Sequence, residues 1–131
     1  MSDEPEWLSK EDVLRAHSRQ LQIFGGAPGI RDDGAIESAL GRPLNKWQYE
    51  NAALPELAAA YAFGIVRNHP FVDGNKRTGF VAMLAFLVLN QIDFAPDQIE
   101  AAAITLGVAA GEISETGLAR WIHDNWPKAS K

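Results

Sequence analysis

The feature that most constrains the fold is an unbroken apolar run, FVAMLAFLVL, at residues 80–89. A membrane-spanning helix needs about 20 such residues, and this run is half as long. We therefore expect no membrane segment here and interpret the run as a helix buried in the core. Directly before it, HPFVDGNKRT at 69–78 is the densest cluster of polar and charged residues in the chain. Together they predict a polar site seated on a core helix.

Composition favours an all-α fold, a compact single domain of about six helices that spans residues 1–131. Alanine occurs 20 times, against three threonines and six valines, which favours helix over sheet. The length of 131 residues is usual for one domain. The ends, 1–6 and 127–131, are expected to fray.

Caps, prolines and glycines set the expected helix ends. Ser9 begins a capping box that opens the first helix, and this helix should stop at Gly25. The second helix is expected to be short, around 35–40, and to end before Gly41 and Pro43. The remaining helices are expected to run from near Pro55 to Asn68, from 74 or 75 to about 90, from Pro96 through 101–110, and onward from a Ser114 cap.

Charge and cysteine content exclude several classes of function. The net charge is −5, whereas non-specific nucleic-acid binding needs a surplus of Lys and Arg. The chain has no cysteine, which excludes disulfides and thiolate metal sites and fits a reducing cytoplasm. The first ten residues are acidic and lack the apolar core of a signal peptide. We therefore expect a cytoplasmic protein with no direct nucleic-acid partner and no membrane partner.

The 69–78 motif has the composition of an anion-binding turn. It is expected to run into a helix N-terminus, where backbone N–H groups lack intrahelical partners and the macrodipole is positive. Gly74 lets the backbone approach an anion closely, and Asn75 can present its amide to the same space. Lys76 and Arg77 add full positive charges. These four residues are the predicted phosphate or nucleotide binders.

His69 and Asp73 supply the groups that a reaction needs. A neutral imidazole can accept a proton from a hydroxyl, and a carboxylate can hold Mg²⁺ against substrate phosphates. The pattern suits transfer of a phosphoryl or nucleotidyl group to a protein hydroxyl, with His69 as base and Asp73 as the catalytic carboxylate and Mg²⁺ ligand. A plainer interpretation stays open, because Asp73-Gly74-Asn75 is also an ordinary turn signal and Asp73 could simply cap the helix. Two ligands are too few for a catalytic zinc.

The motif HPFVDGNKRT resembles the signature of the Fic/Doc superfamily, His-x-Phe-x-Asp/Glu-Gly-Asn, and specifically its death-on-curing (Doc) branch. Adenylylating Fic members carry Gly-Arg-x-x-Arg after the asparagine. Here Lys76 replaces that glycine, and Phe80 stands where the second arginine would be. The segments 24–43, 58–77 and 109–122 also look like Doc-type toxins, so the resemblance covers most of the chain.

This resemblance implies a Fic/Doc-like helical bundle and the toxin of a toxin–antitoxin pair. It implies a protein kinase that moves the γ-phosphate of ATP onto a threonine of elongation factor Tu and so stops translation. His69 would be the base, and Gly74 would shape the phosphate hole. The resemblance also implies metal and phosphate organisers, Asp73 and Asn75, and nucleotide binders, Lys76, Arg77 and Arg67.

Three other functions stay open. The first is adenylyl transfer to a protein hydroxyl as in Fic enzymes, which the missing second arginine disfavours. The second is a non-catalytic module that binds a partner protein. The third is a metal-dependent phosphohydrolase that uses His69 and Asp73.

Inhibition is expected to come from a separate protein. Many Fic proteins carry an inhibitory helix with Ser/Thr-x-x-x-Glu-Gly/Asn, and here only Ser2 with Glu6 fits its first part, followed by Trp7. The resemblance implies a Phd-type antitoxin whose disordered tail folds into a helix on a groove of the toxin.

Four residues outside the chemistry are expected to be structural. His17 falls on the apolar stripe of the first helix and is expected in the core or a groove. Phe71 should point into the core and brace the loop. Arg31 is expected to pair with a carboxylate, and Asp32 or Asp33 to cap the second helix.

Overall fold

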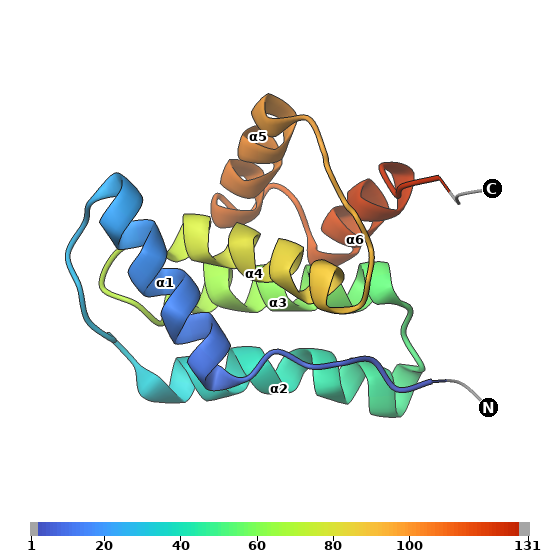
Figure 1. Ribbon diagram of the computed structural model, residues 1–131, viewed down its shortest axis with the longest axis horizontal. Helices are drawn as coiled ribbons and strands as arrows, with labels where there is room; N and C mark the ends of the chain where they lie inside the picture. Colours follow the sequence, from blue (N-terminus) through green and yellow to red (C-terminus); the bar gives the residue numbers. More distant parts are fainter. Residues whose placement is uncertain (1–2, 129–131) are drawn as a thin grey trace.

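The computed structural model describes residues 3–128, and in this part of the chain it contains six helices (Figure 1). The only β-type pairing among these residues is an isolated antiparallel bridge between Ile30 and Phe71. The predicted all-α class is therefore confirmed. The helices are α1 Lys10–Phe24, α2 Asp33–Glu50, α3 Leu54–Asn68, α4 Asn75–Leu89, α5 Gln98–Ala109 and α6 Glu115–Asp124.

Helix α3 lies at the centre of the molecule and packs against α2, α4, α5 and α6, while α1 crosses α4 (Figure 1). Ten of its 15 residues are buried, including the alanines at 58–60. A helix that is apolar on all sides is stable only when it is covered on all sides. One core cluster surrounds Tyr61 and Phe86, and a smaller one around Ile65 and Phe71 lies under the polar motif.

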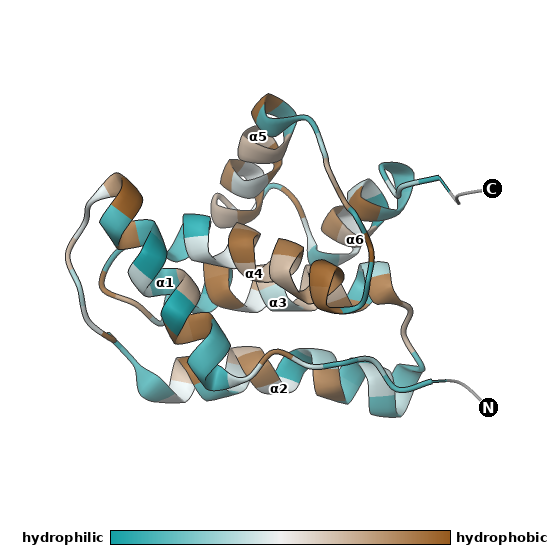
Figure 2. Ribbon diagram, viewed as in Figure 1, coloured by the Kyte–Doolittle hydropathy of each residue, from teal (hydrophilic) through white to brown (hydrophobic). Residues whose placement is uncertain are grey.

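Helix α4 contains the apolar run and carries the motif residues at its N-terminus. It is brown or pale over most of its length in Figure 2, whereas α1 and α2 show alternating teal and brown bands. Phe86 and Leu87 are fully buried as predicted, but Val88 at the C-terminal end is 67% exposed. Gly79 allows a close approach to α3, because a Cβ at Gly79 would lie 2.6 Å from Val66 Cγ2. The start of α4 is therefore held firmly against the core.

Helix α2 is longer than the sequence predicts. The short helix expected around 35–40 instead runs from Asp33 through Gly41 and Pro43 to Glu50. An internal proline costs about 3 kcal/mol because it removes one backbone hydrogen bond. Continuation buries Pro43 and packs Trp47 against the core, and this burial offsets that cost. Tertiary packing therefore outweighs the helix-breaking tendency of Gly41 and Pro43, and no local sequence pattern predicts this packing.

The predicted caps at two other helices are confirmed. Ser9 and Asp12 form a reciprocal capping box on α1, and Ser114 accepts the amide of Gly117 on α6. The expected fraying concerns residues that lie partly outside the described range, namely 1–2 and 129–131. Within it, the Glu6 amide donates to Asn90 Oδ1 at 2.8 Å. Among residues 3–128, no helix combines the length and apolar character that crossing a bilayer demands.

Candidate functional site

The motif loop, residues 69–74, connects the C-terminus of α3 to the N-terminus of α4. His69 follows α3 with φ 56° and ψ 54°, and Gly74 precedes α4 with φ 80° and ψ 15°. Left-handed backbone is ordinary for glycine and uncommon for histidine. Two left-handed residues turn the chain back on itself, so the end of one core helix and the start of the next face the same region.

Arg31 holds the first of these turns. Its Nε donates to the carbonyl oxygen of His69 at 2.6 Å, and its Nη2 donates to that of Asn68 at 2.8 Å. The expected pairing of Arg31 with a carboxylate is wrong. The guanidinium instead binds the carbonyls that a helix C-terminus leaves without intrahelical partners. The predicted cap is confirmed, because Asp32 Oδ1 accepts the Ala35 amide at 3.2 Å.

The segment 29–32 lies antiparallel to the first half of the motif loop. The amides of Arg31 and Asp32 both donate to the Pro70 carbonyl, at 2.7 and 3.0 Å, and the Val72 amide donates to the Gly29 carbonyl at 3.1 Å. This pairing is the isolated bridge noted above. It fixes the backbone of the motif loop at Pro70 and Val72.

Two stacked aromatic rings pack on the core side of the motif loop. Phe71 is fully buried, which confirms its predicted role, and His17 of α1 is 6% exposed. Their rings stack with centroids 3.7 Å apart and planes 7° apart. His17 Nε2 also lies 2.8 Å from the carbonyl oxygen of Asp73. His17 is thus a core residue, as predicted, with one polar contact to the motif.

Asn75 ties the loop together from inside. It is 3% exposed. Its Oδ1 accepts the Phe71 amide and its Nδ2 donates to the Phe71 carbonyl, each at 2.9 Å. These two bonds fix the orientation of the side-chain amide, and the same Nδ2 faces His69 Nδ1 at 3.2 Å. In this arrangement Nδ1 accepts a hydrogen bond, so the hydrogen of the neutral ring is on Nε2.

The Asp73 carboxylate lies at the surface beside the start of α4. Its Oδ1 accepts the Gly74 amide at 2.8 Å, and its Oδ2 accepts the Ala27 amide at 3.2 Å. The Gly74 amide, followed by the Ala27 amide, lowers the pKa of Asp73 below its usual value of 3.8. The carboxylate is therefore ionised at neutral pH. It does not cap α4, whose N-terminus has no side-chain cap.

Lys76 and Arg77 lie at the same helix terminus and are exposed. The Arg77 guanidinium carbon lies 4.5 Å from the centroid of the Phe24 ring at the end of α1. With Phe80, the two cations line one side of a hollow of about 350 Å³ between α4 and α5. The opposite side of this hollow is largely apolar and consists of Gln98, Ala101, Ala102, Thr105 and Leu106.

The Arg67 side chain contacts the end of α5. Its Nη1 donates to the Val108 carbonyl at 3.2 Å, in the last turn of α5. No hydrogen bond or ion pair within residues 3–128 joins Arg67 to the motif loop. The structure thus brings together His69, Asp73 and the 74–77 segment, and it leaves Arg67 at the end of α5.

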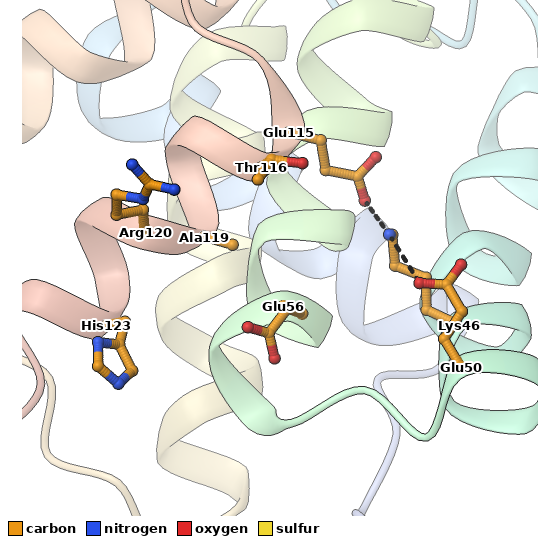
Figure 3. A pocket seen from close by; sticks show the side chains of 8 residues that line it. All are labelled: Lys46, Glu50, Glu56, Glu115, Thr116, Ala119, Arg120 and His123. Carbon is orange, nitrogen blue, oxygen red and sulfur yellow. Dashed lines mark ion pairs between the residues drawn. The ribbon is translucent and has the colours of Figure 1, made fainter.

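A second hollow, between α2, α3 and α6, contains none of the predicted site residues (Figure 3). Figure 3 shows Lys46 between Glu50 and Glu115, and its Nζ lies 3.6 Å from a carboxylate oxygen of each. Arg42 also pairs with Glu115. The charges here pair mainly with one another, as in a structural ion-pair network.

Comparison with known proteins decides which family this site belongs to. The model of the Fic/DOC family matches residues 7–87. The chain belongs to the Fic/DOC family. It is 36% identical to "Protein kinase doc" of Escherichia phage P1 over 113 residues. This aligned region covers 86% of this chain and 89% of that protein. It is 42% identical to "Toxin Doc" of Mycolicibacterium smegmatis strain ATCC 700084 / mc(2)155 over 95 residues. This aligned region covers 70% of this chain and 70% of that protein.

The Fic/DOC match includes every predicted site residue and the helices and loop on which these residues lie. Residues 7–87 contain α1 to α3, the motif loop and nearly all of α4. The predicted resemblance to the family, in its Doc form, is confirmed. The sequence missed the contacts that support this Fic/DOC site, made by Arg31, His17 and the Ala27 amide. Each joins residues 37 to 56 positions apart, and no local pattern encodes such a contact.

Proposed function

We propose that this Fic/DOC protein is the toxin of a toxin–antitoxin pair and acts as a protein kinase. It transfers the γ-phosphate of ATP to a threonine or serine hydroxyl of a translation factor resembling elongation factor Tu, and so arrests translation in the cytoplasm. Two similar relatives carry the names "Protein kinase doc" and "Toxin Doc". The observation that carries the proposal is the His69 ring at the uncapped N-terminus of α4.

The phosphates bind at the start of α4. Its first-turn amides lack intrahelical partners, and an anion there gains about 0.3–1 kcal/mol from the helix dipole. Gly74 has no side chain to obstruct the approach, and the exposed Lys76 and Arg77 neutralise the phosphate charge. Substitution of Arg77 by alanine should weaken ATP binding by a few kcal/mol at most, the scale of one charge-assisted contact.

His69 accepts the proton of the attacking hydroxyl. Because Asn75 faces Nδ1, the other ring nitrogen, Nε2, is the one left for the incoming group. Nε2 carries the ring hydrogen in the resting arrangement, so Nε2 can accept the hydroxyl proton only after that hydrogen has moved to Nδ1, and this move breaks the contact between Nδ1 and Asn75. The contribution of such a base is typically 10²–10⁴ in rate.

The residues present fit Mg²⁺. This ion is commonly held by one or two carboxylates together with substrate phosphates, and Asp73 offers an exposed, ionised carboxylate beside the phosphate site. Residues 3–128 contain no cluster of three or more His, Cys, Asp or Glu side chains suited to a protein-only metal cage. Asp73 would hold the ion, and Mg²⁺ bound there would neutralise part of the negative charge of the phosphates.

A specific observation keeps adenylyl transfer as a second candidate. The motif shares its histidine, acid, glycine and asparagine with adenylylating members, and it differs at Lys76 and Phe80. Phe80 lines the hollow between α4 and α5, where it offers an apolar face in place of a guanidinium. Loss of that cation is our reason to favour γ-phosphate transfer over α-phosphate transfer.

Labelled ATP tests the proposal. The purified chain is incubated with Mg²⁺, elongation factor Tu and ATP labelled at either the γ or the α phosphate. Transfer of the γ label to a threonine supports the kinase, and transfer of the α label supports adenylylation. His69→Ala should lower the rate about 10²–10⁴-fold, while His123→Ala, at an exposed position on α6, should leave it unchanged. Release of phosphate without an acceptor would indicate a phosphohydrolase, and failure to bind ATP by calorimetry would indicate a non-catalytic binding module.

The antitoxin is the proposed partner. Its disordered tail, Phd-like in form, folds as a helix along the hollow between α4 and α5, where an apolar floor lies next to Lys76 and Arg77. Such a surface fits an amphipathic segment with acidic residues. A peptide from the adjacent reading frame should bind with a Kd that rises when Phe80 is replaced by aspartate, and unchanged binding would refute this location.

A further inference from the structure

His17 is a buried histidine whose one hydrogen bond leads to the motif loop. It lies on α1, it is 6% exposed, and its ring stacks on the fully buried Phe71. Its Nε2 lies 2.8 Å from the Asp73 carbonyl oxygen. A carbonyl oxygen only accepts, so Nε2 carries a hydrogen and donates it. The contact therefore has a fixed direction, from α1 to the backbone beside the reactive carboxylate.

The Asp73 carbonyl belongs to the same peptide group as the Gly74 amide. The two ends of a trans peptide point in opposite directions. When His17 holds the carbonyl oxygen toward α1, the Gly74 N–H points away from α1, and there it donates to Asp73 Oδ1 at 2.8 Å. One buried imidazole thus holds the orientation of this peptide, and the Gly74 amide together with the Ala27 amide holds the carboxylate.

Gly74 makes this restraint necessary. Its φ of 80° is open to glycine, which populates many backbone conformations. A peptide next to glycine can rotate at little cost unless something holds it. Rotation here would turn the Asp73 carbonyl, the negative end of the peptide dipole, toward the first turn of α4. That oxygen would then repel a phosphate at the same place.

We propose that His17 is a positioning residue for the anion site. It keeps the Asp73–Gly74 peptide in the orientation in which the carbonyl points inward and the N–H holds the Asp73 carboxylate. The proposal rests on the proposed function, because the anion is taken to be the phosphates of ATP. It gives α1 a role in the chemistry beyond packing.

A core histidine without this role would act only through its volume and its stack on Phe71. His17→Phe separates the two accounts, because phenylalanine keeps an aromatic ring on Phe71 and removes the donor. His17→Gln is the matched variant, because glutamine places an Nε2 donor at about the same distance from the backbone. Should His17→Phe fail to fold, His17→Asn replaces it, since its shorter amide does not reach the Asp73 oxygen.

Two measurements are made on each ¹⁵N-labelled variant. One is the ¹⁵N amide resonance of Gly74. It reports on the hydrogen bond from His17 to the Asp73 carbonyl, because that carbonyl and the Gly74 amide belong to the same peptide group. The other is the Kd for Mg·ATP by calorimetry. We expect His17→Phe to move the Gly74 resonance and to raise the Kd about three- to tenfold, the scale of one hydrogen bond. We expect His17→Gln to restore both toward wild-type values.

An unmoved Gly74 resonance and an unchanged Kd in folded His17→Phe would overturn the proposal and leave His17 as packing. Equal defects in His17→Phe and His17→Gln would also overturn it. The resonance is independent of any ligand. If the wild-type chain binds no ATP but the Gly74 resonance moves in His17→Phe and returns in His17→Gln, the positioning role stands and the proposed function fails.

Discussion

Replacement of Arg31 by alanine tests how the motif loop is held. Arg31 makes two hydrogen bonds, to the carbonyls of His69 and Asn68. Bonds to a charged group contribute about 1.5–3 kcal/mol each, and neutral ones about 0.5–1.5. Arg31 is exposed, so water competes for the same carbonyls and the lower range applies. Two such bonds predict a loss of about 1–3 kcal/mol in the free energy of unfolding.

Urea unfolding followed by circular dichroism measures this loss. A thermal scan should show Tm lower by several degrees, since a loss of about 1 kcal/mol lowers the Tm of a domain of this size by roughly 3–6 °C. Arg31→Lys should recover less than half, because one ammonium group cannot form the forked contact. Arg120→Ala on α6 is the control and should stay within about 0.5 kcal/mol. If Arg31→Ala were as stable as that control, the account of how the α3 terminus is held would be wrong.

Three further predictions concern where single groups carry or lose a hydrogen. Folding lowers the pKa of Asp73 through the amides of Gly74 and Ala27. Its carboxylate therefore stabilises the fold above pH 3.8, and this stabilisation is lost as the pH falls through the native pKa. The difference in Tm between wild type and Asp73→Asn should shrink in acid, and a constant difference would contradict this. Burial raises the pKa of Tyr61 to about 12, so in a Tyr49→Phe variant the remaining phenol should ionise near pH 12 by ultraviolet absorbance, and ionisation near pH 10 in the folded protein would refute it. In ¹⁵N spectra of the free protein His69 should carry its hydrogen on Nε2, as the Asn75 contact requires, and a resting hydrogen on Nδ1 would show that this contact is not made.

The sequence predicts most of the helices because their signals are local. The Ser9 capping box, the Ser114 cap and the alternation of glycine and proline with apolar stripes all act within one or two turns of the residues that they govern. The error at α2 has the opposite origin. Gly41 and Pro43 are strong local breakers, yet packing of Trp47 against the core outweighs them.

The same division applies to the site. The cluster at 69–77 is predicted from its residue types and their spacing, because a loop that runs into a helix N-terminus is a local feature. One side chain nevertheless points elsewhere than predicted. The Asn75 amide closes the motif loop and faces His69. Side-chain direction depends on distant partners, so spacing identifies the cluster and leaves its internal contacts to the structure.

Titration of the ¹⁵N-labelled chain with Mg·ATP tests the central claim most directly, namely that the N-terminus of α4 binds the phosphates beside His69. The account predicts that the backbone amides of Gly74, Asn75, Lys76 and Arg77 shift first and most, together with the His69 ring. Shifts confined to Lys46, Thr116 and Arg120, in the ion-paired hollow between α2 and α6, would place the nucleotide elsewhere and contradict it.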